Sequence, residues 1–133
     1  MKLVLDTNVF NSRKFCNWLL ETPEEKYLPA VAYMEYLYHN LKKGLTQSMT
    51  DAFLEQMNIS VVPFGQSDAI EAANSAIRNW DFAENARDYA IGATAITLTG
   101  TLVTYNVKHF KWIENVVTPD EVINNKRVRP DDP

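Results

Sequence analysis

Short apolar runs alternate with amphipathic stretches along most of this chain. Residues 3–5 form a continuous apolar run, which indicates a short strand buried on both faces. Further strand-like runs lie at residues 27–28, 59–62, 102–105 and 116–117. Because strands that alternate with helices usually form a parallel sheet, the pattern predicts one α/β domain with helices packed against the sheet.

Apolar residues spaced three and four apart predict the helices between these strands. They are expected at residues 12–21, from Pro29 to a stop at Gly44, and at 46–57, 68–79 and 85–99, with a short turn at 107–113. Thr118, Pro119 and Glu121 mark the start of a last helix, and Asp68 with Glu71 resembles a capping box. The inward faces are predicted to carry Val31, Met34, Leu37, Tyr38 and Leu41 in one helix and Met49, Phe53, Leu54 and Met57 in the next.

Composition limits the class of protein. The chain has 133 residues, 46% of them apolar, and a net charge of −4, which fits a single globular domain and gives no sign of a strongly basic nucleic-acid binder. We expect one domain over residues 1–125 and a loose tail at 126–133. A single cysteine, Cys16, excludes an internal disulfide and favours a reducing, cytoplasmic compartment. No apolar stretch is long enough for a membrane span, and Asp6 and Asn8 interrupt any signal-peptide core.

Asp6 stands directly after the first predicted strand, in the stretch LVLDTNVF. Ligands of parallel sheets bind outside the carboxyl ends of the strands, so this position favours a functional carboxylate. Asp, Thr and Asn are also preferred helix caps, and Asp6 could simply cap the first helix. The position alone leaves both interpretations open.

Glu35 and Asp88 are two further candidate acids. Glu35 lies in mid-helix beside the apolar face, although its carboxylate could reach water from the edge of that face. Asp88 lies near the start of the helix that carries RDYAIGATAITLTG, where the helix dipole alone would favour a carboxylate. The small residues Ala90, Gly92, Ala93 and Ala95 predict that another element packs closely against this helix.

Carboxylates that converge at strand ends would form an all-oxygen site suited to Mg²⁺ or Mn²⁺. Zinc is not favoured, because His39 and His109 are far apart in sequence and there is no cysteine pair. Crowded carboxylates repel one another without a metal, so Asp6→Asn is expected to remove activity with little loss of stability.

Three motifs together resemble the PIN domain, most closely the VapC-type ribonuclease toxins: LVLDTNVF, the mid-helix Glu35, and DYAIGATAI followed by TLVTYNVKHF. The resemblance runs from Leu3 to about Ile123. It implies a three-layer, Rossmann-like fold with about five parallel strands, and hydrolysis of RNA phosphodiesters with Mg²⁺ or Mn²⁺. It implies Asp6, Glu35 and Asp88 as catalytic and metal-binding acids, with Asn8 and Thr104 as polar support. It also implies a homodimer and an antitoxin partner.

The sequence departs from this family in TYNVKHF, residues 104–110. Family members usually carry a fourth acid where this chain has Asn106 or His109, so a second metal would be held less well. Lys42, Lys43, Lys108, Lys111, Lys126, Arg127 and Arg129 are candidates for contacts to the RNA backbone.

Two other functions remain open on sequence alone. The missing fourth acid allows a PIN-fold module that binds RNA or a protein without cleaving it. A haloacid-dehalogenase-like phosphatase also begins with a strand that ends in aspartate, but that family needs a second aspartate where this chain has Asn8.

Overall fold

The computed structural model describes residues 1–125, which form a five-stranded parallel sheet flanked by helices. The strands are β1 (Lys2–Leu5), β2 (Glu25–Pro29), β3 (Ile59–Val62), β4 (Thr101–Val103) and β5 (Val116–Val117). Their order across the sheet is β3-β2-β1-β4-β5, and every neighbouring pair is parallel. The predicted fold class, an α/β domain with about five parallel strands, is therefore confirmed.

The helices follow the predicted alternation, and their bounds differ by a few residues from the sequence pattern. They are the 3-10 helices η1 (Thr7–Asn11) and η2 (Val107–Phe110) and the α-helices α1 (Arg13–Glu21), α2 (Ala30–Lys42), α3 (Gln47–Gln56), α4 (Gln66–Ala76), α5 (Phe82–Thr97) and α6 (Pro119–Asn125). None of the helices within residues 1–125 is both long and apolar enough to cross a membrane.

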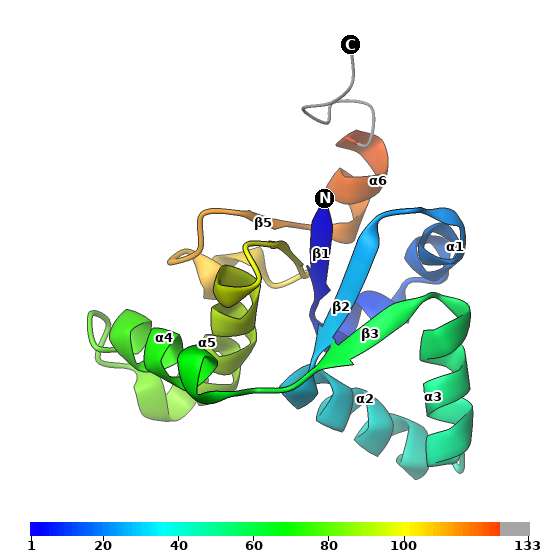
Figure 1. The fold of residues 1–133 in the computed structure, drawn as a ribbon, viewed down its shortest axis with the longest axis horizontal. Helices are drawn as coiled ribbons and strands as arrows, with labels where there is room; N and C mark the ends of the chain where they lie inside the picture. Colours follow the sequence, from blue (N-terminus) through cyan, green and yellow to red (C-terminus); the bar gives the residue numbers. More distant parts are fainter. Residues whose placement is uncertain (126–133) are drawn as a thin grey trace.

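The central strand β1 fixes the architecture. Its residues Leu3, Val4 and Leu5 have no exposed surface, because helices cover both faces of the sheet. In Figure 1, α1 and α3 lie on one side of β1 and β2, and α4 and α5 lie on the other. From β1 the chain adds β2 and β3 in one direction, and later adds β4 and β5 in the other. A right-handed crossover places the connecting helices on opposite faces when the direction reverses, which gives the three layers.

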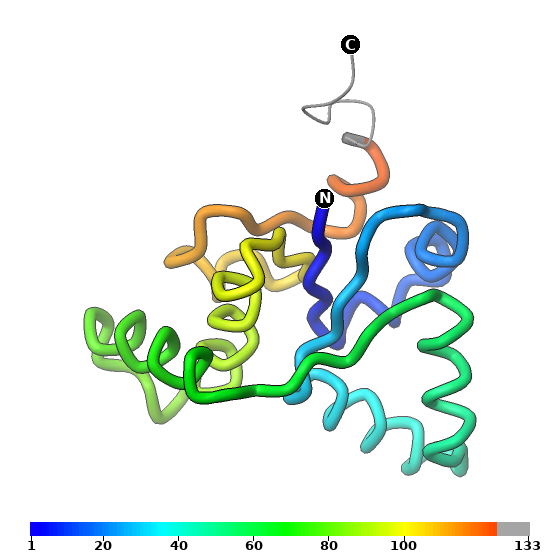
Figure 2. The backbone as a smooth tube through the Cα atoms, viewed as in Figure 1, coloured from blue at the N-terminus to red at the C-terminus, as the bar shows by residue number. Residues whose placement is uncertain are grey.

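Helix α5 packs very closely against its neighbours, as its small residues predicted. It runs beside α4 (Figure 2). A Cβ atom added at Gly92 would lie 2.5 Å from Cδ1 of Ile113 and 2.5 Å from Cη2 of Trp112. Glycine is therefore needed here for the close approach of the segment that follows η2.

The predicted inward faces of α2 and α3 are partly wrong. Met34, Tyr38 and Leu41 of α2 are exposed, as are Met49 and Phe53 of α3, whereas the predicted Leu54 and Met57 are buried. The buried positions of α2 are Ala32 and Asn40, and Asn40 donates a hydrogen bond to Thr50 across the two helices at 3.1 Å. A face that carries small or polar residues can be the buried one, and apolar periodicity alone does not detect it.

Side-chain caps account for several helix starts. Ser12 accepts a hydrogen bond from the backbone of Phe15 at the start of α1, and Thr46 accepts one from Met49 at the start of α3. Thr118 and Glu121 form the reciprocal capping box that the sequence predicted at α6. Asp68 is the third residue of α4 rather than its cap, and it accepts from the backbone of Gly65. The predicted tail, residues 126–133, lies outside the described residues.

Candidate active site

The sheet brings the ends of β1 and β4 together at the point where the strand order reverses. Such a switch point forms a crevice at the carboxyl ends of the strands. Asp6 follows β1 and has no exposed surface. Its carboxylate accepts the backbone N–H of Thr7 at 2.7 Å, so it does cap the 3-10 helix η1. The first α-helix is capped by Ser12 instead. Capping thus uses only part of the Asp6 carboxylate.

Thr104, the residue after β4, binds the other oxygen of Asp6. Its Oγ1 donates a hydrogen bond to Asp6 Oδ2 at 2.8 Å. The same Oγ1 accepts from Asn8 Nδ2 at 3.2 Å and from the backbone N–H of Asn106 at 3.0 Å. The side-chain oxygen Oδ1 of Asn8 in turn accepts a hydrogen bond from the backbone N–H of Tyr105. This network fixes the Asp6 carboxylate, and it places Asn8 and Thr104 beside the acid, where the resemblance expected them.

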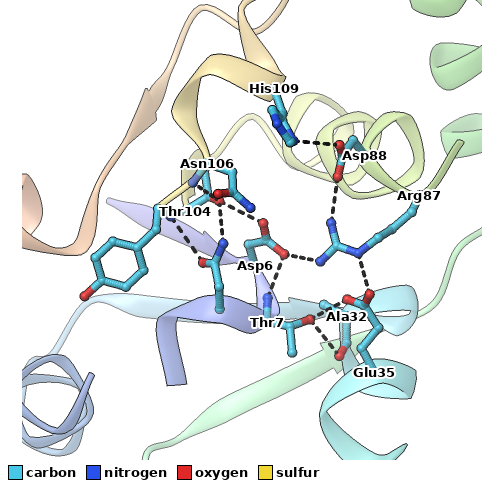
Figure 3. A network of polar contacts seen from close by, with 11 residues as sticks. Asp6, Thr7, Ala32, Glu35, Arg87, Asp88, Thr104, Asn106 and His109 are labelled. Carbon is cyan, nitrogen blue, oxygen red and sulfur yellow. Dashed lines mark hydrogen bonds and ion pairs between the residues drawn. The ribbon is translucent and has the colours of Figure 1, made fainter. Parts of the chain in front are cut away.

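The two other predicted acids reach the same crevice from helices. Glu35 lies near the middle of α2, and the Thr7 hydroxyl donates to its Oε1 at 2.8 Å. Asp88 lies on α5, three residues after Asn85, which breaks the helix with φ −126° and ψ 19°. The regular part of α5 therefore starts just before Asp88 and directs its first turn at the crevice (Figure 3).

Arg87 joins all three acids. Its Nη2 donates to Asp6 Oδ1 at 2.6 Å, its Nε donates to Glu35 Oε2 at 2.5 Å, and its Nη1 donates to Asp88 Oδ1 at 2.6 Å. Figure 3 shows the guanidinium pointing into the space between the three carboxylates. The structure thus brings Asp6, Glu35 and Asp88 together around one point.

Arg87 was not among the site residues predicted from the sequence. One signal was present, because a cation in the first turn of a helix is unfavourable against the helix dipole unless it has anionic partners. An arginine at a helix start, directly before a candidate acid, therefore indicates that acidic partners lie close to it in the fold. Those partners lie 52 and 81 residues away in sequence.

Charge in this cluster favours the ionised forms of Arg87 and Glu35. Burial alone would lower the pKa of Arg87, but hydrogen bonds and charge from Glu35 and Asp6 raise it well above its usual range. Burial likewise would raise the pKa of Glu35, but the hydrogen bonds from Arg87 and Thr7 and the guanidinium charge hold it below its usual value. One positive charge thus faces three negative ones.

The donor set fits a divalent ion in its chemistry, since it consists of carboxylate and hydroxyl oxygens. The carboxylates, as they are spaced in this structure, do not form a metal-binding site. Within residues 1–125, no group of three or more His, Cys, Asp or Glu side chains is arranged closely enough to hold a metal ion. The guanidinium of Arg87 stands between the acids.

The two positions of the missing fourth acid differ in what they contact. The Nδ1 atom of His109 lies 3.4 Å from Asp88 Oδ2, so this imidazole faces the acid cluster. Asn106 is exposed, and its backbone N–H contacts Thr104. Figure 3 shows His109 and Asn106 on the same rim of the crevice.

A hollow lies on each side of the acid cluster. One, of about 550 Å³, is lined by Glu35 and Arg87 and by three residues with basic side chains, His39, Lys42 and Lys43. The other, of about 460 Å³, is lined by Asp88 and by Lys108, His109 and Lys111. Four of the predicted RNA-contacting lysines therefore flank the acids, while Lys126, Arg127 and Arg129 lie outside the described residues.

Comparisons with known proteins agree with this fold. The chain is similar to a toxin–antitoxin complex from Klebsiella pneumoniae, with 27% identity, a TM-score of 0.69, and coverage of 88% of this chain and 97% of that one. It is also similar in fold to VapBC-1 from nontypeable Haemophilus influenzae, with 17% identity, a TM-score of 0.65 and coverage of 89% and 96%. VapBC2 from Rickettsia felis, bound to a DNA fragment from the promoter, has 20% identity, a TM-score of 0.62 and coverage of 89% and 97%.

A comparison with curated proteins gave no match. The family model for the PIN domain matches residues 3–123, which include every element from β1 to most of α6. That range contains the Asp6, Glu35 and Asp88 carboxylates and the strand ends that bring them together. The chain belongs to the PIN domain family.

Proposed function

We propose that this chain is a metal-dependent endoribonuclease and the toxin of a toxin–antitoxin pair. One observation carries the proposal: Asp6, Glu35 and Asp88, from three separate elements, meet around a single cation at the switch point of the sheet. A protein interior gains nothing from concentrating three acids on one spot, since their mutual repulsion and desolvation must be offset. Such a cluster is typical of a site that binds a positively charged ligand.

Asp6, Glu35 and Asp88 would hold Mg²⁺ or Mn²⁺, with water completing the coordination. A divalent ion held by these carboxylates would supply an activated water and would offset charge on the phosphate. Thr104 and Asn8 orient the Asp6 carboxylate, and Thr7 orients that of Glu35. Glu35 is only partly buried, so its carboxylate is also accessible to act as a general base beside the attacking water.

The flanking hollows support RNA as the substrate. Lys42 and Lys43 lie on one side of the acids, and Lys108 and Lys111 lie on the other. An RNA strand that crosses the crevice would place one phosphate over the acids and the neighbouring phosphates near these ammonium groups. Single-stranded or looped RNA fits best, because its bases can turn away from a backbone held in this way.

The remaining parts of the proposal come from the relatives and from composition. Several similar structures are toxin–antitoxin complexes, which supports an antitoxin as partner. A homodimer is proposed on the same resemblance, and a cytoplasmic location is proposed on the single cysteine, Cys16. Exposed aromatic side chains give this dimer only limited support: Trp18, Tyr33 and Tyr36 pack against the core, whereas Tyr38 and Trp80 are exposed. Light scattering at micromolar protein concentration tests the dimer, and a monomeric mass would contradict it.

Cleavage of an end-labelled RNA tests the activity. Wild-type protein should cleave with Mn²⁺ or Mg²⁺ and stop when EDTA is added, and Asp6→Asn should be inactive under all conditions. Asp120→Asn is the matched control, because Asp120 is an exposed acid on α6. Equal cleavage by wild type and Asp6→Asn would identify a contaminant or a different site, and either result rejects the proposal.

The competing function is a PIN-fold module that binds RNA or a protein without cleaving. The occupation of the acid cluster by Arg87 and the absence of a fourth acid at Asn106 and His109 favour it. Binding of RNA by wild type, without cleavage at any concentration of Mn²⁺ or Mg²⁺, would select this alternative.

A further inference from the structure

The guanidinium of Arg87 fills the space at which a metal ion would touch all three acids. Its nitrogens Nε, Nη1 and Nη2 each contact a different carboxylate, at 2.5–2.6 Å. Asp6 is fully buried, so this is more than a surface ion pair. A planar guanidinium can bind three carboxylates at its edges, which a lysine ammonium cannot reproduce in the same geometry.

The acids cannot hold one ion together while Arg87 stays in place. Within residues 1–125 no three metal-ligating side chains come close enough to share an ion. A divalent ion beside the guanidinium would also face a positive charge a few ångströms away, in a partly buried site where repulsion is weakly screened. Metal binding by all three acids therefore requires Arg87 to leave.

The Arg87 side chain has space into which it can move. Its side chain is 35% exposed, and it lines the hollow that also contains Lys42 and Lys43. The described contacts of its guanidinium are those to the three acids, so leaving them breaks no packing in the core. In the hollow it would lie on the side where the substrate backbone is proposed to run.

We propose that Arg87 and a divalent metal ion compete for the carboxylates of Asp6, Glu35 and Asp88. Arg87 stabilises the metal-free protein as an internal counter-ion, and it lowers the apparent affinity for metal, because only the fraction of molecules with a displaced Arg87 can bind. This inference rests on the proposed metal site and adds a residue that controls when that site fills.

Calorimetric titration of Mn²⁺ into wild type and Arg87→Gln tests the competition. Arg87→Gln should bind Mn²⁺ at least about tenfold more tightly, since a tenfold change needs only the loss of one modest competing interaction. Arg78→Gln is the matched control, because Arg78 is exposed on the segment after α4 and its loss changes the net charge equally. The control should bind Mn²⁺ as wild type does.

Thermal melts give a second measure. Without metal, Arg87→Gln should melt below wild type, and Mn²⁺ should raise its melting temperature by more than it raises that of wild type. If Arg87→Gln does not fold, Arg87→Lys decides, because it keeps a charge but cannot span the acids and should still bind Mn²⁺ more tightly than wild type.

Nitrogen–proton NMR of the arginine side chains follows the displacement directly. The Nε–H signal of Arg87, identified by its absence in Arg87→Gln, should move toward the position of a solvated arginine as diamagnetic Mg²⁺ is added.

The outcomes separate this inference from the proposed function. Mn²⁺ binding with equal or weaker affinity in Arg87→Gln and Arg87→Lys overturns the competition and leaves the metal site standing. An Arg87 signal that stays unchanged while Mg²⁺ binds does the same. Absence of metal binding in every variant at millimolar concentration overturns the metal site, and the competition with it.

Discussion

Arg87 Nη2 lies 2.6 Å from Oδ1 of Asp6, a carboxylate with no exposed surface. The contact spans 81 residues of sequence and links the end of β1 to helix α5, which precedes β4. This contact changes the expected effect of the acid cluster on the stability of the fold. On sequence alone the acids were expected to repel one another, whereas in the structure each one is attracted to the same cation.

Asp6→Asn should therefore destabilise the metal-free protein. The asparagine can still accept hydrogen bonds, but Arg87 loses a buried charged partner, at a cost of about 1–2 kcal/mol. Urea unfolding with EDTA present measures this cost. Asp120→Asn serves as the control and should be near neutral. An Asp6→Asn protein more stable than wild type would show that repulsion among the acids outweighs the contact with Arg87.

The stability of wild type relative to Glu35→Gln should depend on pH. Burial would raise the pKa of Glu35 above its ordinary value of 4.5, but the hydrogen bonds from Arg87 and Thr7 and the charge of the guanidinium together outweigh burial and hold it below that value. The unfolded chain then binds more protons than the folded one between these two pKa values. The advantage of wild type should be fully present above pH 4.5 and disappear as the pH falls through the lower, folded pKa.

Thermal melts from pH 3 to pH 7, with EDTA, check this window. Glu55→Gln is the control, because Glu55 is an exposed glutamate on α3, and its difference from wild type should stay flat. A difference between wild type and Glu35→Gln that grows toward acid would contradict the ion pair with Arg87.

The sequence pattern located the elements and the acids but not the cation between them. Asp6 could be found because strands buried on both faces have a simple signature, and the residue after such a strand stands at the sheet edge. The place of Arg87 at a helix start was a signal that it needs anionic partners, but its partners could not be identified, since Asp6 and Glu35 become its neighbours only when α2 and α5 meet β1. The prediction of the inward face of α2 was wrong for a related reason. Asn40 is polar in sequence, and it is buried because it pairs with Thr50 of another helix.

Gly92→Ala should destabilise the fold by about 1–3 kcal/mol through overpacking. The new methyl group would lie 2.5 Å from Trp112 and Ile113, and Trp112 is held against Tyr89 with ring centroids 4.9 Å apart. Chemical unfolding measures the loss. Trp112→Leu in the same protein should restore part of it, so a double-mutant cycle should give a favourable coupling. Additive effects would mean that the backbone shifts to accept the methyl group.

His109→Asp should tighten the binding of Mn²⁺ and raise cleavage at low metal concentration. Because Nδ1 of His109 lies 3.4 Å from Asp88 Oδ2, an aspartate there would add a carboxylate to the rim of the acid cluster. The added charge attracts a divalent ion and gives it a further oxygen ligand. The same charge should lower the stability of the metal-free protein, since it brings a fourth acid to a cluster with one arginine.

Asn106→Asp is the informative comparison for this prediction. Asn106 is the other position at which the family usually carries an acid, but it is exposed, and the contact described for it is the backbone hydrogen bond to Thr104. Calorimetry should therefore show a larger gain in Mn²⁺ affinity for His109→Asp than for Asn106→Asp. Equal affinities in wild type and His109→Asp, together with weaker RNA binding, would mean that His109 contacts the RNA backbone from the hollow it shares with Lys108 and Lys111. A gain confined to Asn106→Asp would move the missing fourth ligand to that position instead.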